Sequence, residues 1–374
     1  MKIQKHATDQ MTPLERRRAV REGRDYDRVP CIPFMGEFKC RLTGTSVWDF
    51  WHDPQKMAEV EIAAFNRYGY DRIVIGPNTR GITEALGGRF IYPERGLPYA
   101  DEPLLGDARG EDGMEASAGY GLLDGMEASA GYGLLDGMEA VDAGRHGRIR
   151  TFRREAEFLA DEAKDIVPIE ISIGGPFTIA SNLRGVERLL RDLRKCPEKV
   201  QRLLRLITDS QKSCIDMAAE YGFGVAMADP VANPALIGPK MYERFVYPCT
   251  KELTDYALER TGERVSLHMC GRTYGIWEYL CRYELNELSL DNIIDLERAV
   301  RELGELVPIA GNVDPVEIVM NGSREEIFEA VRYCIETGRK AKKGYVLASG
   351  CDIPDTTEPV RIDWLMEAAR TYRK

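Results

Sequence analysis

Short apolar runs and longer amphipathic stretches alternate along the chain, and this alternation is its most regular feature. Eight apolar runs are bounded by Gly, Pro, Asp or Asn, which indicates buried β-strands. The segments between them carry apolar residues at helical spacing. The predicted strands cover residues 28–34, 71–76, 165–173, 222–228, 265–271, 287–290, 307–310 and 344–348.

Helix signals fall between these runs. Thr12-Pro13-Leu14-Glu15 predicts a helix N-terminus, with Thr12 as the N-cap, Pro13 at the first helical position and Glu15 as the capping-box partner. Further helical patterns cover residues 54–68, 296–303 and 324–336.

Strands and helices in this order predict an α/β protein, a closed parallel (β/α)8 TIM barrel that forms one domain over residues 1–374. Residues 1–27 are expected to form an N-terminal helical extension, and residues 105–145 an insertion at the rim. The alternative is an open doubly wound sheet. No G-x-G-x-x-G turn follows the first predicted strand, which argues against that alternative and against a nucleotide cofactor.

The predicted insertion contains a tandem repeat. Residues 112–123 are repeated without change at residues 124–135, and a third copy begins at Asp136. The unit is too short and too rich in glycine to be a solenoid repeat. We expect a flexible excursion or lid on the barrel rim, and favour a structural role without chemistry over a functional one.

In a closed parallel barrel the carboxyl ends of all strands meet at one rim, where functional groups gather. The polar residues that follow the predicted strands therefore share this rim. They are Glu37, Asn78, Thr178, Asp229, His268, Cys270, Asp291, Asn312, Asp314, Cys351 and Asp352.

His268 and Cys270 lie two positions apart at the end of a predicted strand, so their side chains are expected on one face. Cys351 follows another predicted strand far downstream. This long gap excludes a zinc finger and suits a catalytic zinc site with an open fourth position. Buried cysteines also pack as small hydrophobes. We favour the metal site because His268 is the only one of four histidines in a strongly apolar run.

Composition narrows the class of protein. The chain has 374 residues, 44% of them hydrophobic, and a net charge of −10, so no overall basic field is available for nucleic acid. No run approaches the length of a membrane helix, and the basic N-terminus lacks the apolar core of a signal peptide. Nine irregularly spaced cysteines do not resemble a disulfide framework. These features predict a cytoplasmic protein without nucleic-acid or membrane partners.

Several segments together resemble the uroporphyrinogen decarboxylase superfamily, whose members are α/β barrels. They span roughly residues 160–360, and the N-terminal third matches only loosely. The segments are Gly174-Gly175-Pro176-Phe177-Thr178-Ile179-Ala180-Ser181, Asp229-Pro230, Gly311-Asn312-Val313-Asp314-Pro315 and the two cysteine motifs.

Two requirements of the family's decarboxylases are missing. The arginine-rich segment expected after the first strand is replaced by residues 33–38, and the aspartate expected after the second strand is replaced by Asn78. His268, Cys270 and Cys351 instead resemble the zinc set of the methylcobamide:coenzyme M methyltransferases. That resemblance implies zinc at these three residues, and a methylcobalamin (corrinoid) cofactor presented by a separate corrinoid protein over the barrel mouth.

Other rim residues are weaker candidates for substrate binding. Glu37 is either a fourth metal ligand or an ion-pair partner for Lys39 or an arginine, and Asp229 either positions a substrate or forms a turn. The remaining candidates are Asn78, Asn312 and Asp314, of which Asp314 is also a possible helix cap. Arg184 and Arg188 are expected on a solvated helix face, and Cys31, Cys249 and Cys334 in the core.

The sequence thus predicts a zinc-dependent methyltransferase that moves a methyl group between a corrinoid protein and a small acceptor, with a zinc-activated thiol favoured. Two cysteine ligands make zinc electron-rich, which suits delivery of a thiolate. One alternative is a demethylase that passes methyl from a methoxy or methylamine substrate to Co(I). Others are a tetrapyrrole decarboxylase and a non-catalytic binding barrel.

Overall fold

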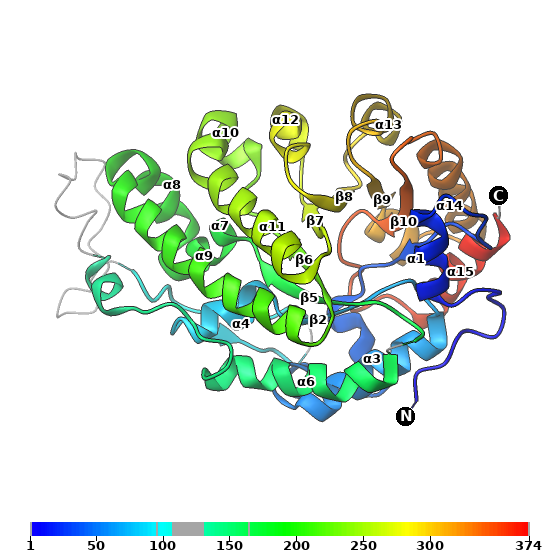
Figure 1. Ribbon diagram of the computed structural model, residues 1–374, viewed down its shortest axis with the longest axis horizontal. Coiled ribbons are helices and arrows are strands. Elements are labelled where there is room, and N and C mark those ends of the chain that lie inside the picture. The colour runs from blue at the N-terminus through cyan, green and yellow to red at the C-terminus, as the bar shows by residue number, and fades with distance from the viewer. Residues whose placement is uncertain (1, 95, 107–130, 164, 373–374) are drawn as a thin grey trace.

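The computed structural model describes residues 2–94, 96–106, 131–163 and 165–372 (Figure 1). Most of the predicted repeat insertion lies outside these residues, so its predicted role as a lid stays a prediction. None of the described helices is long and apolar enough to cross a membrane.

Eight parallel strands form the central sheet of a (β/α)8 TIM barrel, as predicted. Their hydrogen-bonded order is β1-β10-β9-β8-β7-β6-β5-β2. Each predicted strand overlaps an observed one. The strands are β1 (Cys31–Ile32), β2 (Ile73–Pro77), β5 (Ile169–Gly174), β6 (Gly224–Ala228), β7 (Val265–Met269), β8 (Leu285–Leu290), β9 (Ile309–Val313) and β10 (Tyr345–Ser349).

Helices pack around the outside of this curved sheet (Figure 1). The α-helices are α1 (Pro13–Arg21), α2 (Val47–His52), α3 (Pro54–Tyr68), α4 (Asn78–Ala85), α6 (Gly147–Ala163), α7 (Pro176–Arg184), α8 (Val186–Lys195), α9 (Pro197–Glu220), α10 (Pro234–Met241), α11 (Tyr247–Thr261), α12 (Trp277–Leu280), α13 (Leu296–Leu303), α14 (Arg324–Gly338) and α15 (Pro359–Thr371). Shorter elements are the hairpin β3 (Phe90–Ile91) and β4 (Tyr99–Ala100), and the helical turns η1 (Gly36–Leu42), η2 (Gly133–Gly137), η3 (Tyr242–Val246), η4 (Thr273–Ile276) and η5 (Pro315–Met320).

Capping fixes the helix ends that the sequence predicts. The Thr12 side chain accepts from Glu15 N and the Glu15 side chain accepts from Thr12 N, which is the predicted capping box of α1. Ser323 and Glu326 form a second capping box at α14. These helices begin where they do because the capping side chains satisfy backbone N–H groups that have no partner within the helix.

The barrel closes between β1 and β2 through Asp71. Asp71 N donates to Cys31 O at 2.9 Å, and the Asp71 carboxylate accepts from Cys31 N at 2.6 Å. Two buried guanidinium groups, those of Arg16 in α1 and Arg28, pair with the same carboxylate. The N-terminal extension is therefore bound to the barrel at its β1–β2 seam by buried ion pairs.

Arg184 corrects one sequence prediction, because it does not lie on a solvated helix face. Its side chain is fully buried, and Nε lies 2.7 Å from Asp192 Oδ2. The guanidinium also stacks on the Tyr132 ring, 4.8 Å from its centroid. Burial is tolerated because Asp192 neutralises the charge. Tyr132 belongs to the second repeat copy, so the end of that copy is part of the packed core.

Removing one partner of a buried ion network leaves uncompensated charge in the interior. Asp71→Asn should therefore lower the free energy of unfolding by about 3–5 kcal/mol. Urea denaturation of the purified protein measures the change. The matched control is Glu302→Gln, which removes an exposed ion pair with Arg298 on α13 and should cost less than about 0.5 kcal/mol. Equal effects of the two substitutions would show that the seam network does not hold the barrel closed.

Candidate metal centre and substrate cavity

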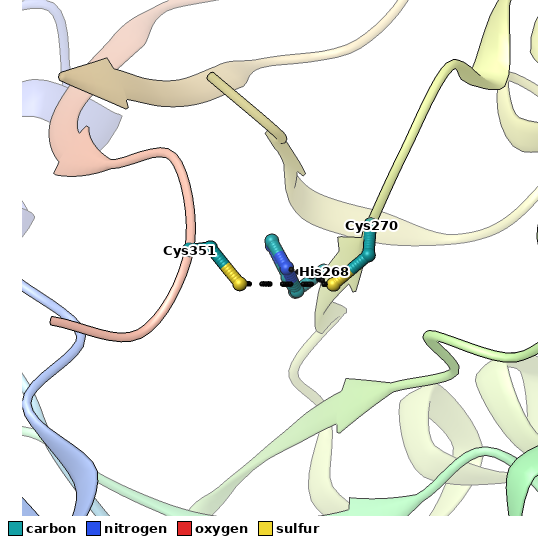
Figure 2. A group of neighbouring side chains, drawn as sticks. All are labelled: His268, Cys270 and Cys351. Atoms are coloured by element: carbon teal, nitrogen blue, oxygen red, sulfur yellow. Dashed lines mark hydrogen bonds between the residues drawn. The ribbon is translucent and has the colours of Figure 1, made fainter. Parts of the chain in front are cut away.

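His268, Cys270 and Cys351 converge at the carboxyl ends of two strands that are far apart in sequence (Figure 2). His268 is in β7, Cys270 follows β7 and Cys351 follows β10. His268 Nε2 lies 3.1 Å from Cys270 Sγ, and the two sulfur atoms lie 3.8 Å apart. One donor atom from each residue lies within 4.8 Å of the other two, and all three side chains are half-buried. The structure thus brings the three predicted ligands together.

Glycine allows both cysteine loops to approach their neighbours. Gly271 has a φ of +78°, and a Cβ there would lie 1.6 Å from Asn233 Nδ2. That amide donates to Cys270 O at 3.1 Å and fixes the loop after β7. A Cβ on Gly350 would lie 2.3 Å from Asn292 N. The glycine beside each cysteine is therefore required by a close contact, with the Asn233 side chain at Gly271 and with the Asn292 backbone at Gly350.

Ser289 orients the imidazole. It pairs with His268 across the β7–β8 ladder, and its Oγ lies 2.9 Å from His268 Nδ1. With Nδ1–H donating to Ser289, the lone pair of Nε2 faces the sulfur atoms, as a metal ligand requires. The Phe34 ring packs against the imidazole with centroids 5.4 Å apart. The histidine is thus held in a ligating orientation by groups that do not ligate.

The two thiol groups have pKa values that are shifted in opposite directions. The hydrogen bond that Cys270 donates lowers the pKa of Cys351 to about 4. The pKa of Cys270 is raised, first by its hydrogen bond to Cys351 and then by burial. This contact favours the thiolate form of Cys351, which is the form that soft cations bind.

A cavity of about 380 Å³ opens beside this cluster. His268, Cys270 and Cys351 line it, as do two of the residues predicted to bind substrate, Glu37 and Asn78. This volume fits a small molecule.

Glu37 is an ion-pair partner in this structure. Its Oε1 accepts from Trp51 Nε1 at 3.0 Å and from the Arg80 guanidinium, which lies over the Trp51 ring at 4.4 Å from the centroid. Of the two roles predicted for Glu37, the ion pair with an arginine is the one observed, and Lys39 pairs with Glu61 instead. Asn78 begins α4 with a φ of +45°, and its Oδ1 accepts from Arg80 N at 2.7 Å. Glu37 and Asn78 together hold Arg80 against the cavity.

Asp229, Asn312 and Asp314, the other predicted substrate-binding residues, are not among the residues that line this cavity. The buried Asp229 carboxylate accepts from Thr178 N at 2.8 Å and from Phe177 N, and burial raises its pKa to about 6. Asn312 Nδ2 donates to Asp291 O and Ile294 O. The Asp314 side chain caps η5. Thr178 Oγ1 also donates to Asp229, and Asn292 Nδ2 donates to Asp314, which takes the cap role that the sequence allowed. These contacts with neighbouring loop residues shape the rim.

Sequence reasoning missed Ser289, Arg72 and Arg80. Ser289 stands out only as a hydroxyl within an apolar strand. Arg72 points into the barrel and pairs with Glu170 and Glu287, and the single signal is its charge at the start of an apolar run. Arg80 follows Asn78 on a helix and gives no signal of its own. Such roles depend on contacts between strands, which a sequence pattern does not specify.

Comparison with known proteins is consistent with this geometry. The profile of the uroporphyrinogen decarboxylase (URO-D) family matches residues 12–120 and 133–372. The methylcobamide:CoM methyltransferase MtbA of Methanosarcina acetivorans is 25% identical over 366 residues, which cover 97% of this chain and 98% of that protein.

Two further similar proteins come from Methanosarcina mazei. A methylated-thiol–coenzyme M methyltransferase is 28% identical over 193 residues, 51% of each chain. A solved structure of a methyltransferase superposes with a TM-score of 0.80 at 20% identity, over 98% of this chain and 100% of that chain. This superposition confirms the fold.

The hydrogen bond between Ser289 and His268 can be tested by metal affinity. Ser289→Ala should lower the affinity for zinc by about 10- to 100-fold, because the imidazole loses the partner that fixes its tautomer and orientation. Competition with a chromophoric chelator measures this affinity. Ser172→Ala is the matched control, since Ser172 lines the same cavity from β5 and should leave affinity unchanged. Equal affinities for the two variants would refute the orienting role.

Proposed function

The chain belongs to the uroporphyrinogen decarboxylase family and is an enzyme of the methyltransferase type, and on that premise we propose that it transfers a methyl group between a corrinoid protein and a small thiol held at zinc. The observation that carries the proposal is the meeting of one imidazole and two thiols beside a cavity of small-molecule size. This donor set, with an open fourth position, is that of a catalytic zinc site.

The spacing of the donors fits such an ion. Two thiolates on a tetrahedral zinc at about 2.3 Å would lie roughly 3.8 Å apart. The sulfur atoms of Cys270 and Cys351 lie 3.8 Å apart. The contact from His268 Nε2 to Cys270 Sγ, 3.1 Å, is somewhat shorter than the roughly 3.6 Å that the same geometry requires, and a small rotation of the imidazole removes the difference.

A zinc ion bound here would supply a positive centre that holds an incoming thiol as the thiolate at neutral pH. The chain's own residues bind and orient. Cys270 and Cys351 provide negative charge, and Ser289 fixes the His268 tautomer. Phe34 and Trp51 line the cavity with apolar surface, which limits water around the thiol. Arg80, held by Glu37, adds a fixed cation to the cavity wall.

The corrinoid partner would approach the barrel mouth. Large apolar side chains are exposed on several elements that follow the barrel strands. They are Trp48 (56% exposed), Leu236 (53%), Ile293 (49%) and Val316 (39%). Such residues are common in protein interfaces, and this distribution supports docking of a protein over the cavity. A location in the cytoplasm, where thiols stay reduced, suits this chemistry.

The activity should depend on zinc and on its three ligands. Zinc-loaded protein should demethylate methylcobalamin in the presence of a thiol, whereas His268→Ala and Cys351→Ser should lose zinc and at least about 100-fold in rate, as expected when a metal ligand is removed. Loss of methylcobalamin absorbance reports the rate, and elemental analysis reports zinc.

Cys281→Ser is the matched control, because Cys281 is a half-buried cysteine outside the cluster. It should keep both zinc and activity. Methyl transfer that survives complete chelation of metal, or that is unaffected by Cys351→Ser, would contradict the proposal.

A further inference from the structure

The charges that line the cavity do not balance. Its three basic side chains are each paired with a carboxylate, Lys39 with Glu61, Arg72 with Glu287 and Arg80 with Glu37. Two more carboxyl groups, those of Glu155 and Asp352, line the cavity and have no ion pair within the described residues. A bound molecule would therefore meet two carboxyl groups that have no ion-pair partner, whereas each of the three basic side chains in the cavity wall already has one.

One of these carboxyls lies in a side pocket formed by Lys39, Glu61, Tyr70 and Glu155. The four residues come from η1, α3, the segment before β2, and α6, and all line the same cavity as the metal cluster. They lie near the seam where β1 and β2 share no strand ladder. The pocket is buried, with Glu61 and Glu155 each 2% exposed and Tyr70 3% exposed.

Glu155 has a carboxylate oxygen without a partner in the side pocket, since its Oε2 has no hydrogen bond among the described residues. Glu61 and Tyr70 face one another, and burial followed by the Glu61 carboxylate raises the pKa of the Tyr70 hydroxyl well above its usual range. Burial, followed by the neighbouring Glu61 charge, also raises the pKa of Glu155 well above its usual range. The charged groups that face Glu155 are Glu61 of α3, Lys39 of η1 and Arg148 of α6. A buried carboxylate oxygen without a partner is costly, so Glu155 Oε2 points to a ligand.

We propose that the side pocket binds an ammonium group of the small-molecule substrate, so that this substrate is an amine rather than an anion. The inference rests on the proposed function, because it takes this cavity to hold the small-molecule substrate. An ammonium group can donate to Glu155 Oε2, and its charge offsets an ionised Glu155. A sulfonate or carboxylate tail would find no unpaired cation among the described residues of the side pocket, since Lys39 is paired with Glu61.

Calorimetry with matched ligands tests the proposal. The probes are aminoalkanethiols of two to four carbons, their hydroxyl and sulfonate counterparts, and simple alkylamines of the same lengths. Among the thiols, the best amine should bind at least tenfold tighter than its hydroxyl and sulfonate counterparts. Titrations in two buffers of different ionisation enthalpy should show protons released on amine binding, since pairing with the ligand lowers the raised pKa of Glu155.

Glu155→Gln should abolish both the amine preference and the proton release. A thermal midpoint close to that of the wild type shows that the variant is folded. Asp161→Asn, an exposed acid on the same helix, is the matched control and should bind amines as the wild type does. Tyr70→Phe tests the same pocket and should also weaken amine binding. It takes the place of Glu155→Gln if that variant is poorly folded.

The alkylamines separate this inference from the proposed function. They contain no thiol and should bind with or without zinc. If the protein prefers amines but transfers no methyl group, the proposed function is refuted and the proposed amine-binding pocket stands. Tighter binding of sulfonates than amines, or an amine preference that survives both Glu155→Gln and Tyr70→Phe, would overturn the subsite while leaving the zinc chemistry intact.

Discussion

Closure of the barrel depends on Asp71, whose backbone and carboxylate both bind the backbone of Cys31 while the carboxylate also pairs with Arg16 and Arg28. The other barrel strands are joined by ladders of hydrogen bonds, but β1 has two residues and no ladder to β2. A buried charge network takes over that role. It brings the carboxyl ends of all eight strands to one rim, and it leaves room beside the seam for the side pocket of Lys39, Glu61, Tyr70 and Glu155.

The metal cluster follows from this closure. Cys270 and Cys351 are separated by 81 positions, yet their sulfur atoms lie 3.8 Å apart because β7 and β10 end at the same rim. Local rules then set the fine geometry. The i, i+2 spacing on a strand places His268 and Cys270 on one face, glycines at 271 and 350 allow close loop contacts, and Ser289 fixes the imidazole. The fold supplies proximity, and neighbouring side chains supply orientation.

Much of this arrangement was predictable from the sequence. Eight apolar runs identified the strands, and capping residues placed the start of α1, because both signals are local. The three candidate ligands were identified from residue type and position at strand ends. The burial of Arg184 was not predictable, since it depends on Asp192 and Tyr132. For Asp229 and Asp314 the sequence allowed both a structural role and substrate binding, and it did not decide between them. The hydrogen bonds of Asn312 to backbone carbonyls were not predictable. An acid following a strand gives the same sequence signal whether it faces a cavity or caps a helix.

The central claim is that two cysteines and one histidine hold zinc with a position left open for a thiol. X-ray absorption at the zinc edge measures the ligands directly. The account predicts two sulfur atoms at about 2.3 Å and one imidazole nitrogen at about 2.0–2.1 Å per zinc, with a third sulfur added when a thiol binds. Zinc surrounded only by oxygen and nitrogen, or a sulfur count that does not change when a saturating thiol is present, would contradict it.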